Sequence, residues 1–151
     1  MSSRRGAVRL IWARHGENIA NLTGTFSHAV FDGDLTDRGR QQAEELGHRL
    51  AKAPGGAVGF VAVSPLRRAV HTGDIVGRRL GLEPQLVLEA LRELAVGDLD
   101  GRNNPAAWRT YESVLEAWRC GDAQARFPSA GDRDPARRVL ATLPHPTTPP
   151  T

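Results

Sequence analysis

The chain has 151 residues, which is enough for one domain and too few for two. Apolar residues make up 40% and charged residues 25%, as in an ordinary globular protein, which excludes a disordered, collagen-like or disulfide-scaffold chain. Lys and Arg outnumber Asp and Glu by 20 to 17, and although the isoelectric point is about 9.9, a net charge of +3 alone does not predict a polyanionic partner.

The first half of the chain predicts two strands with a helix between them. Residues 8–13 and 58–63 are continuous apolar runs, which are typical of strands buried on both faces of a parallel sheet. Between them we expect a helix that has Thr36 as its N-cap and extends to about Lys52. Gly39, in the first turn of this helix, lowers the local helix propensity.

The alternation of strands and helices continues after the second strand. Ser64 is a favourable N-cap and Pro65 a favourable first residue for a helix that extends to about Arg79. Residues 85–88 then predict a third strand. Strands that alternate with helices indicate an α/β fold with a parallel sheet.

The last third of the chain predicts a helix that begins at the pair Asn104-Pro105 and ends near Gly121. We expect a loop over 128–134, a short helix over 135–143 and a disordered segment at 144–151. The Asn104-Pro105 helix carries large side chains at helical spacing, which core packing explains. They are Trp108, Tyr111, Leu115 and Trp118.

Neither a membrane segment nor a targeting segment is expected. No apolar run approaches the ~18 residues of a membrane-spanning helix, and Met1–Arg5 leads into a strand rather than a signal-peptide core. The single Cys120 excludes an intramolecular disulfide and a multi-cysteine zinc site. The arginines are scattered among acids, so nucleic acid is not an expected partner. We predict a cytoplasmic protein without a membrane partner.

Two strand ends carry residues suited to phosphate chemistry. Ligands of open α/β sheets bind at the carboxyl ends of the strands, where Arg14 and His15 follow one strand and Arg68 another. If these strands are neighbours, an imidazole lies between two guanidiniums. Guanidiniums bind phosphate oxygens in bidentate fashion, and an imidazole can carry a phosphoryl group. Gly16 would let the backbone approach the ligand closely.

Each of these residues also has a purely structural explanation. Arg-His-Gly is a common tripeptide, and Arg67 and Arg68 suit an ordinary solvated pair at the start of a helix. Glu93 suits an ordinary surface carboxylate. The other histidines have no metal-ligand spacing, so no metal site is expected; they are His28, His48, His71 and His145.

Four motifs in a fixed order favour the chemical explanation. They are Arg14-His-Gly-Glu-Asn-Ile-Ala-Asn21, Asp34–Ala43, Ser64–Thr72 and Leu91–Gly101. In this order they resemble the signature, the lead into the first helix, the second arginine motif and the acid-bearing loop of the histidine phosphatase superfamily, the phosphoglycerate mutase-like proteins.

The resemblance implies a role for five residues. His15 would be the nucleophile that becomes phosphohistidine, Arg14 and Arg68 would bind the phosphoryl oxygens, and Asn21 would add a side-chain donor. Glu93 would protonate the leaving oxygen and then activate water.

The resemblance also implies the fold and the reaction. A histidine phosphatase-like domain over residues 1–143 would form a three-layer α/β/α sandwich with a mostly parallel sheet. It would need no metal or organic cofactor and would hydrolyse a small phosphorylated substrate. The acid-bearing loop is short, which favours a phosphatase over a mutase.

The sequence departs from the family near its C-terminal end, which we expect to be truncated or atypical. The family has a second histidine in a Ser-His-Gly-like motif after a further apolar strand, and this sequence has none. His145 stands between two prolines without a strand before it and is not assigned that role. Loss of one preorganised donor costs about 2.7–4 kcal/mol, or 10²–10³ in rate, so weakened hydrolysis is expected.

Two alternatives remain open at this point. A pseudophosphatase would keep the Arg14, His15 and Arg68 pocket as a binding or regulatory module without turnover. In addition, a missing central strand would expose strand edges, so a homodimer that covers them is a hypothesis. A monomer in sedimentation at micromolar concentration would contradict the dimer.

Overall fold

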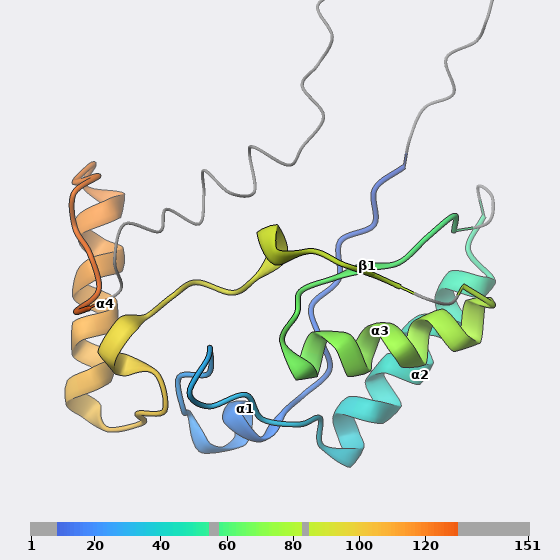
Figure 1. Cartoon of the computed structure of the whole chain (residues 1–151), viewed down its shortest axis with the longest axis horizontal. Coiled ribbons are helices and arrows are strands. Elements are labelled where there is room, and N and C mark those ends of the chain that lie inside the picture. Colours follow the sequence, from blue (N-terminus) through green and yellow to red (C-terminus); the bar gives the residue numbers. More distant parts are fainter. Residues whose placement is uncertain (1–8, 55–57, 83–84, 130–151) are drawn as a thin grey trace, which may run out of the picture.

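The computed structural model of the chain describes residues 9–54, 58–82 and 85–129. The short helix predicted over 135–143 and the disordered segment predicted at 144–151 lie outside these residues. The elements in order are α1 (Ile19–Thr23), α2 (Asp37–Ala51), β1 (Ala62–Val63), α3 (Arg67–Leu80), β2 (Leu86–Val87), the 3-10 turns η1 (Glu89–Leu91) and η2 (Gly97–Leu99), and α4 (Pro105–Arg119) (Figure 1).

The described strands form a parallel pair. Ala62 pairs with Leu86 and Val63 with Val87, and α3 connects the two strands. This strand–helix–strand unit confirms the α/β class and the parallel pairing expected from the sequence. Both strands are shorter than the apolar runs that predicted them.

The first predicted strand is not among the strands of the described residues, so this prediction is wrong over 9–13. These residues have no regular backbone pairing, and the side chains of Leu10 and Trp12 are 70% and 71% exposed. An apolar run becomes a strand only where a neighbouring strand exchanges backbone hydrogen bonds with it. A dimer would cover such exposed apolar side chains, but the oligomeric state stays a prediction.

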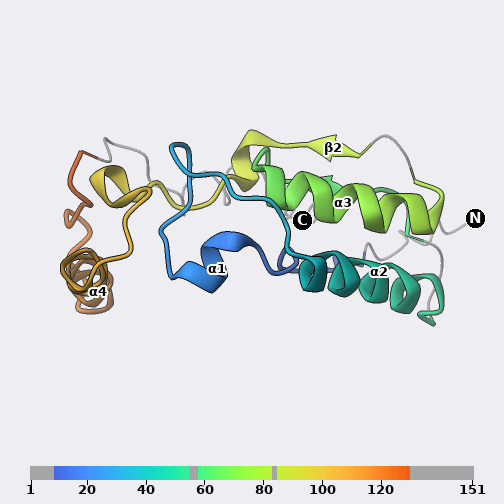
Figure 2. The same ribbon diagram turned by 90° about the horizontal axis from the view of Figure 1, so that it is seen from below.

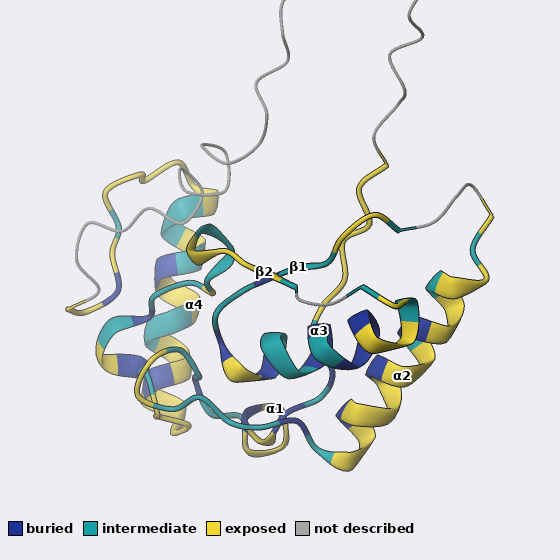
Figure 3. Cartoon of the chain, turned by 45° about the vertical axis from the view of Figure 1, so that its right-hand side comes forward, coloured by how far each residue is buried: buried dark blue, intermediate teal, exposed yellow. Residues whose placement is uncertain are grey.

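Helices α2 and α3 lie side by side, with α3 between α2 and the strand pair (Figure 2). Leu35, Ala43 and Ile75 form a buried cluster between them, whereas the outer face of α2 is exposed (Figure 3). The predicted N-cap is confirmed, because Thr36 Oγ1 accepts the Gly39 N–H at 3.0 Å. These two helices therefore support one side of the strand pair.

The predicted N-cap of the next helix is wrong. Helix α3 begins at Arg67, and its N-cap is Leu66 rather than Ser64. Ser64 Oγ accepts the Leu66 N–H at 3.4 Å, so these residues form a turn before the helix. The Arg67 N–H donates instead to the carboxylate of Asp32 at 2.8 Å. The capping acceptor comes from a segment 35 residues earlier in the chain, which the local sequence does not reveal.

A second hydrophobic core lies along one face of α4, at a distance from α2 and α3 (Figure 1). The predicted cap is confirmed, since Asn104 Oδ1 accepts the Ala107 N–H at 2.9 Å. Tyr111 and Trp118 pack on the cluster, as the helical spacing predicts, whereas Trp108 is 39% exposed. The buried members of this cluster are Phe26, Val96, Leu99, Ala107, Val114 and Phe127.

The described helices are short. The longest, α2 and α4, have 15 residues each, and no helix in the described ranges is both long and apolar enough to cross a membrane. The cytoplasmic location stays a prediction.

Gly39 is required where α2 meets the segment that leads into α1. A Cβ at Gly39 would overlap the carbonyl oxygen of Glu17, and a Cβ at Gly16 would overlap the carbonyl oxygen of Gly39. The glycine that lowers helix propensity therefore permits two backbones to pack in contact. This close approach fixes the segment containing His15 against the first turn of α2.

We expect Gly39→Ala to lower the free energy of unfolding by about 1–3 kcal/mol, because the cost of overpacking exceeds the gain of about 1 kcal/mol in helix propensity. Urea denaturation measures this change. Gly59→Ala is the control, since no atom lies within 4 Å of a Cβ placed there. It should change stability by less than about 0.5 kcal/mol. Equal stability of the two variants would contradict the role of Gly39.

Candidate active site

His15 presents an unprotonated ring nitrogen to a guanidinium. Its Nδ1 lies 2.7 Å from the carbonyl oxygen of Gly16 and must donate to it, because a carbonyl oxygen only accepts. Its Nε2 accepts from Nε of Arg68 at 3.1 Å. These two hydrogen bonds define one tautomer of a neutral imidazole, with the Nε2 lone pair directed at Arg68.

Arg68 is the buried cation of this site, only 4% exposed. Its Nη1 donates to Ser27 Oγ at 3.0 Å and its Nη2 to the Ser27 carbonyl oxygen at 3.1 Å. The carboxylate of Asp32 lies 3.5 Å from Nη1. A buried charge needs such partners, so the alternative of an ordinary solvated pair is wrong for Arg68, although Arg67 is exposed.

The surroundings of His15 favour its neutral form. Burial is the largest effect that lowers its pKa below the ordinary 6.5, and the positive charges of Arg68 and Arg14 lower it further. The hydrogen bond to Gly16 and the charge of Glu93 act in the opposite direction without cancelling these effects. These effects keep Nε2 unprotonated, with its lone pair accepting the Arg68 hydrogen bond.

Arg14 and Glu93 are exposed residues whose charges act on the site. The charge of Arg14 acts on both His15 and Arg68, and so does the opposite charge of Glu93. Both side chains are exposed, and Glu93 Oε1 accepts the Leu94 N–H at 2.9 Å. The structure thus brings His15 and Arg68 into contact and places Arg14 and Glu93 near enough for their charges to act on both.

Asn21 is the predicted site residue that the structure places differently. It is the third residue of α1, where its Oδ1 accepts the Asn18 N–H at 3.1 Å while Asn18 Oδ1 accepts the Asn21 N–H at 3.0 Å. This capping box engages the amide oxygen, so that Nδ2 is the atom available as a donor. The spacing of Asn18 and Asn21 is the local signal that could have predicted α1.

Sequence reasoning did not identify Ser27 or Asp32, which hold the guanidinium of Arg68. Neither residue has a local signal, because its role depends on a contact between segments distant in the chain. The interpretation of Gly16 also changes. Its missing side chain accommodates Gly39, and its N–H donates to Thr72 Oγ1 at 3.1 Å rather than facing a ligand.

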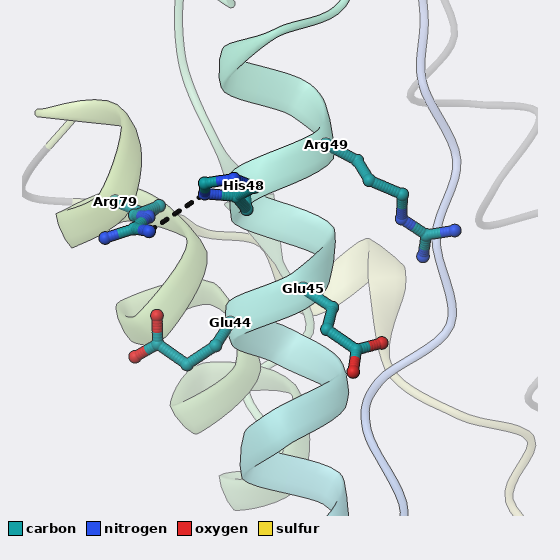
Figure 4. Close-up of a pocket in the computed structure, with 5 residues that line it drawn as sticks. All are labelled: Glu44, Glu45, His48, Arg49 and Arg79. Carbon is teal, nitrogen blue, oxygen red and sulfur yellow. Dashed lines mark hydrogen bonds between the residues drawn. The ribbon is translucent and has the colours of Figure 1, made fainter.

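A separate hollow on the surface lies between α2 and α3 (Figure 4). Arg79 donates to His48 Nδ1 at 2.9 Å there, about 16 Å along α3 from Arg68. Its lining mixes both charge signs and contains none of the predicted site residues: Glu44, Glu45, His48, Arg49 and Arg79. In the described ranges, no three His, Cys, Asp or Glu side chains gather as metal ligands.

Comparison with known sequences defines the class of protein. The sequence profile of the histidine phosphatase superfamily (branch 1) matches residues 10–143, and the chain belongs to this superfamily. It is 36% identical over 128 residues to the adenosylcobalamin/alpha-ribazole phosphatase of Salmonella typhimurium, covering 83% of this chain and 59% of that protein. It is also 36% identical over 137 residues to the 2,3-bisphosphoglycerate-dependent phosphoglycerate mutase of Methylobacterium radiotolerans, covering 87% and 62%.

Solved structures agree with this assignment. The mycobacterial glucosyl-3-phosphoglycerate phosphatase superposes with a TM-score of 0.64 at 29% identity, over 85% of this chain and 60% of that one. A putative alpha-ribazole-5'-P phosphatase from Escherichia coli superposes with a TM-score of 0.61 at 30% identity, over 84% and 61%. The family resemblance drawn from the four motifs is confirmed. The chain spans about three-fifths of the length of these relatives, which are phosphatases and mutases.

We expect the pKa of His15 to lie below 6.5 and to rise in Arg14→Gln, because that variant removes one positive charge near the ring. NMR titration of isotope-labelled histidines measures both values, and His15→Ala assigns the signal. Arg109→Gln, which removes an exposed arginine of α4, is the matched control and should leave the His15 pKa unchanged. A His15 pKa at or above 6.5 would contradict the burial of the ring.

Proposed function

We propose that the chain is a phosphomonoester hydrolase that acts through a phosphohistidine on His15. The observation that supports this proposal is the 3.1 Å hydrogen bond from the buried Arg68 guanidinium to the unprotonated Nε2 of His15. It sets a phosphate-binding cation beside the atom that would attack phosphorus.

The reaction would proceed in two displacements. His15 Nε2 forms a bond to phosphorus while the bond to the leaving oxygen breaks, and Glu93 gives that oxygen its proton. Glu93 then takes a proton from water, whose oxygen forms a bond to phosphorus as the bond to Nε2 breaks. Arg14 and Arg68 stabilise the charge on the phosphoryl oxygens in both steps, and the Asn21 amide adds a donor.

The substrate class that fits this site is a small phosphomonoester. Two relatives are an adenosylcobalamin/alpha-ribazole phosphatase and a glucosyl-3-phosphoglycerate phosphatase. The short acid-bearing loop favours hydrolysis here, whereas the similarity to a phosphoglycerate mutase supports phosphoryl transfer to a second hydroxyl as the other candidate. Both reactions use the same phosphohistidine.

We expect His15→Ala to abolish hydrolysis of p-nitrophenyl phosphate, a loss of at least about 10³-fold, because it removes the nucleophile. The matched control is His48→Ala, which removes an exposed histidine of α2 and should keep the parent rate. Release of p-nitrophenol measures both.

Equal activity of His15→Ala and the parent would contradict the proposal. A parent chain that binds inorganic phosphate but hydrolyses nothing would instead support a pseudophosphatase, a binding or regulatory module built on the same pocket.

A further inference from the structure

The carboxylate of Asp100 binds three successive backbone N–H groups of a distant loop. The N–H of His28 donates to Oδ1 at 2.9 Å, and those of Ala29 and Val30 donate to Oδ2 at 2.7 and 2.6 Å. Successive N–H groups that converge in this way form a concavity for an anion. Here the anion is a side chain from a segment about 70 residues later in the sequence.

This loop is the one that holds Arg68. The carbonyl oxygen of Ser27, which accepts from Nη2 of Arg68 at 3.1 Å, belongs to the same peptide unit as the N–H of His28. The peptide unit is planar, and its C=O and N–H point in opposite directions. It therefore connects Asp100 on one side to Arg68 on the other, and fixing its N–H fixes the direction of its C=O.

Neighbouring backbone bonds hold the same two segments in one register. The Phe26 N–H donates to the Arg102 carbonyl oxygen at 2.9 Å, and the Gly101 N–H donates to the Phe26 carbonyl oxygen at 2.8 Å. Although burial alone would raise the pKa of Asp100, the N–H groups of the loop lower it below the ordinary 3.8. The carboxylate is thus ionised at neutral pH and is a strong acceptor for all three donors.

We propose that Asp100 is a positioning residue that orients Arg68 through the peptide unit between Ser27 and His28. The inference rests on the proposed function of the site and adds a residue to it. The hydrogen bonds of Asp100 go to the loop and not to His15, and Asp100 follows Glu93 by seven residues in the same segment. It links the segment that carries the general acid to the cation that binds the phosphoryl group.

Asp100→Asn tests this link, because it keeps the size of the side chain but removes its charge and one acceptor oxygen. We expect the Kd for inorganic phosphate and the KM for p-nitrophenyl phosphate to rise by about tenfold, since a misplacement of about 1 Å can cost up to about 100-fold. Asp100→Glu, which restores a carboxylate, should recover part of the affinity.

Asp98→Asn is the matched control. Asp98 lies two residues earlier in η2, and its exposed carboxylate accepts from Ser129 Oγ at 3.0 Å rather than from the loop. This variant should keep the parent affinity. In an Arg68→Lys background, where the guanidinium fork is already lost, Asp100→Asn should weaken phosphate binding by less than about twofold.

The titration of His15 gives a readout that needs no ligand. The charge of Arg68 lowers the His15 pKa, so displacement of Arg68 in Asp100→Asn should raise that pKa, whereas loss of the Asp100 charge without displacement would lower it. Asp98→Asn should leave the pKa unchanged. If Asp100→Asn does not fold, Ser27→Ala is the second variant, because it removes the Oγ partner of Arg68. It should raise both the Kd for inorganic phosphate and the pKa of His15.

An unchanged phosphate Kd together with an unchanged His15 pKa would overturn the role of Asp100. The role would also be overturned if Asp98→Asn weakened phosphate binding as much as Asp100→Asn does. The same holds if Asp100→Asn still weakened phosphate binding by about tenfold in the Arg68→Lys background. A parent chain without turnover, combined with these Asp100 effects, would refute the hydrolase and leave the positioning role standing.

Discussion

The guanidinium of Arg68 is only 4% exposed, and the site depends on how this charge is satisfied. A buried charged group destabilises the fold unless most of its N–H groups donate hydrogen bonds to acceptors in the protein. The acceptors come from two segments, one at His15 and the other the loop that contains Ser27 and Asp32. Binding Arg68 therefore holds the His15 segment, this loop and the start of α3 in one arrangement.

The same contacts create the chemistry of the site. Burial and two nearby arginines favour the neutral imidazole of His15, and its Nδ1 hydrogen bond to Gly16 leaves Nε2 as the unprotonated nitrogen. All three guanidinium nitrogens of Arg68 donate to protein groups, so the contacts that make the buried charge tolerable also fix its position beside His15.

The described part of the chain has two cores. Helices α2 and α3 pack around the first, and α3 carries Arg68, whereas the aromatic core around α4 includes Val96 and Leu99, which follow Glu93 in the chain. The loop around Ser27 joins the two parts, because Phe26 belongs to the aromatic core and Ser27 to the site. The chain spans about three-fifths of the length of its relatives, and His15 and Arg68 lie within the family match at residues 10–143.

The sequence by itself determined the α/β class, the caps at Thr36 and Asn104, and the proximity of Arg68 to His15. Caps depend on residues within one helical turn and can be read locally, whereas the proximity of Arg68 to His15 came from motifs in a fixed order, although the segment before His15 is not the buried strand that was expected. Only the tertiary structure decided where α3 begins and that the apolar run at 9–13 stays unpaired. It also decided how Ser27, Asp32 and Asp100 hold Arg68. These outcomes depend on hydrogen bonds between residues 35 to 72 positions apart, and a linear pattern does not specify which distant donor meets which acceptor.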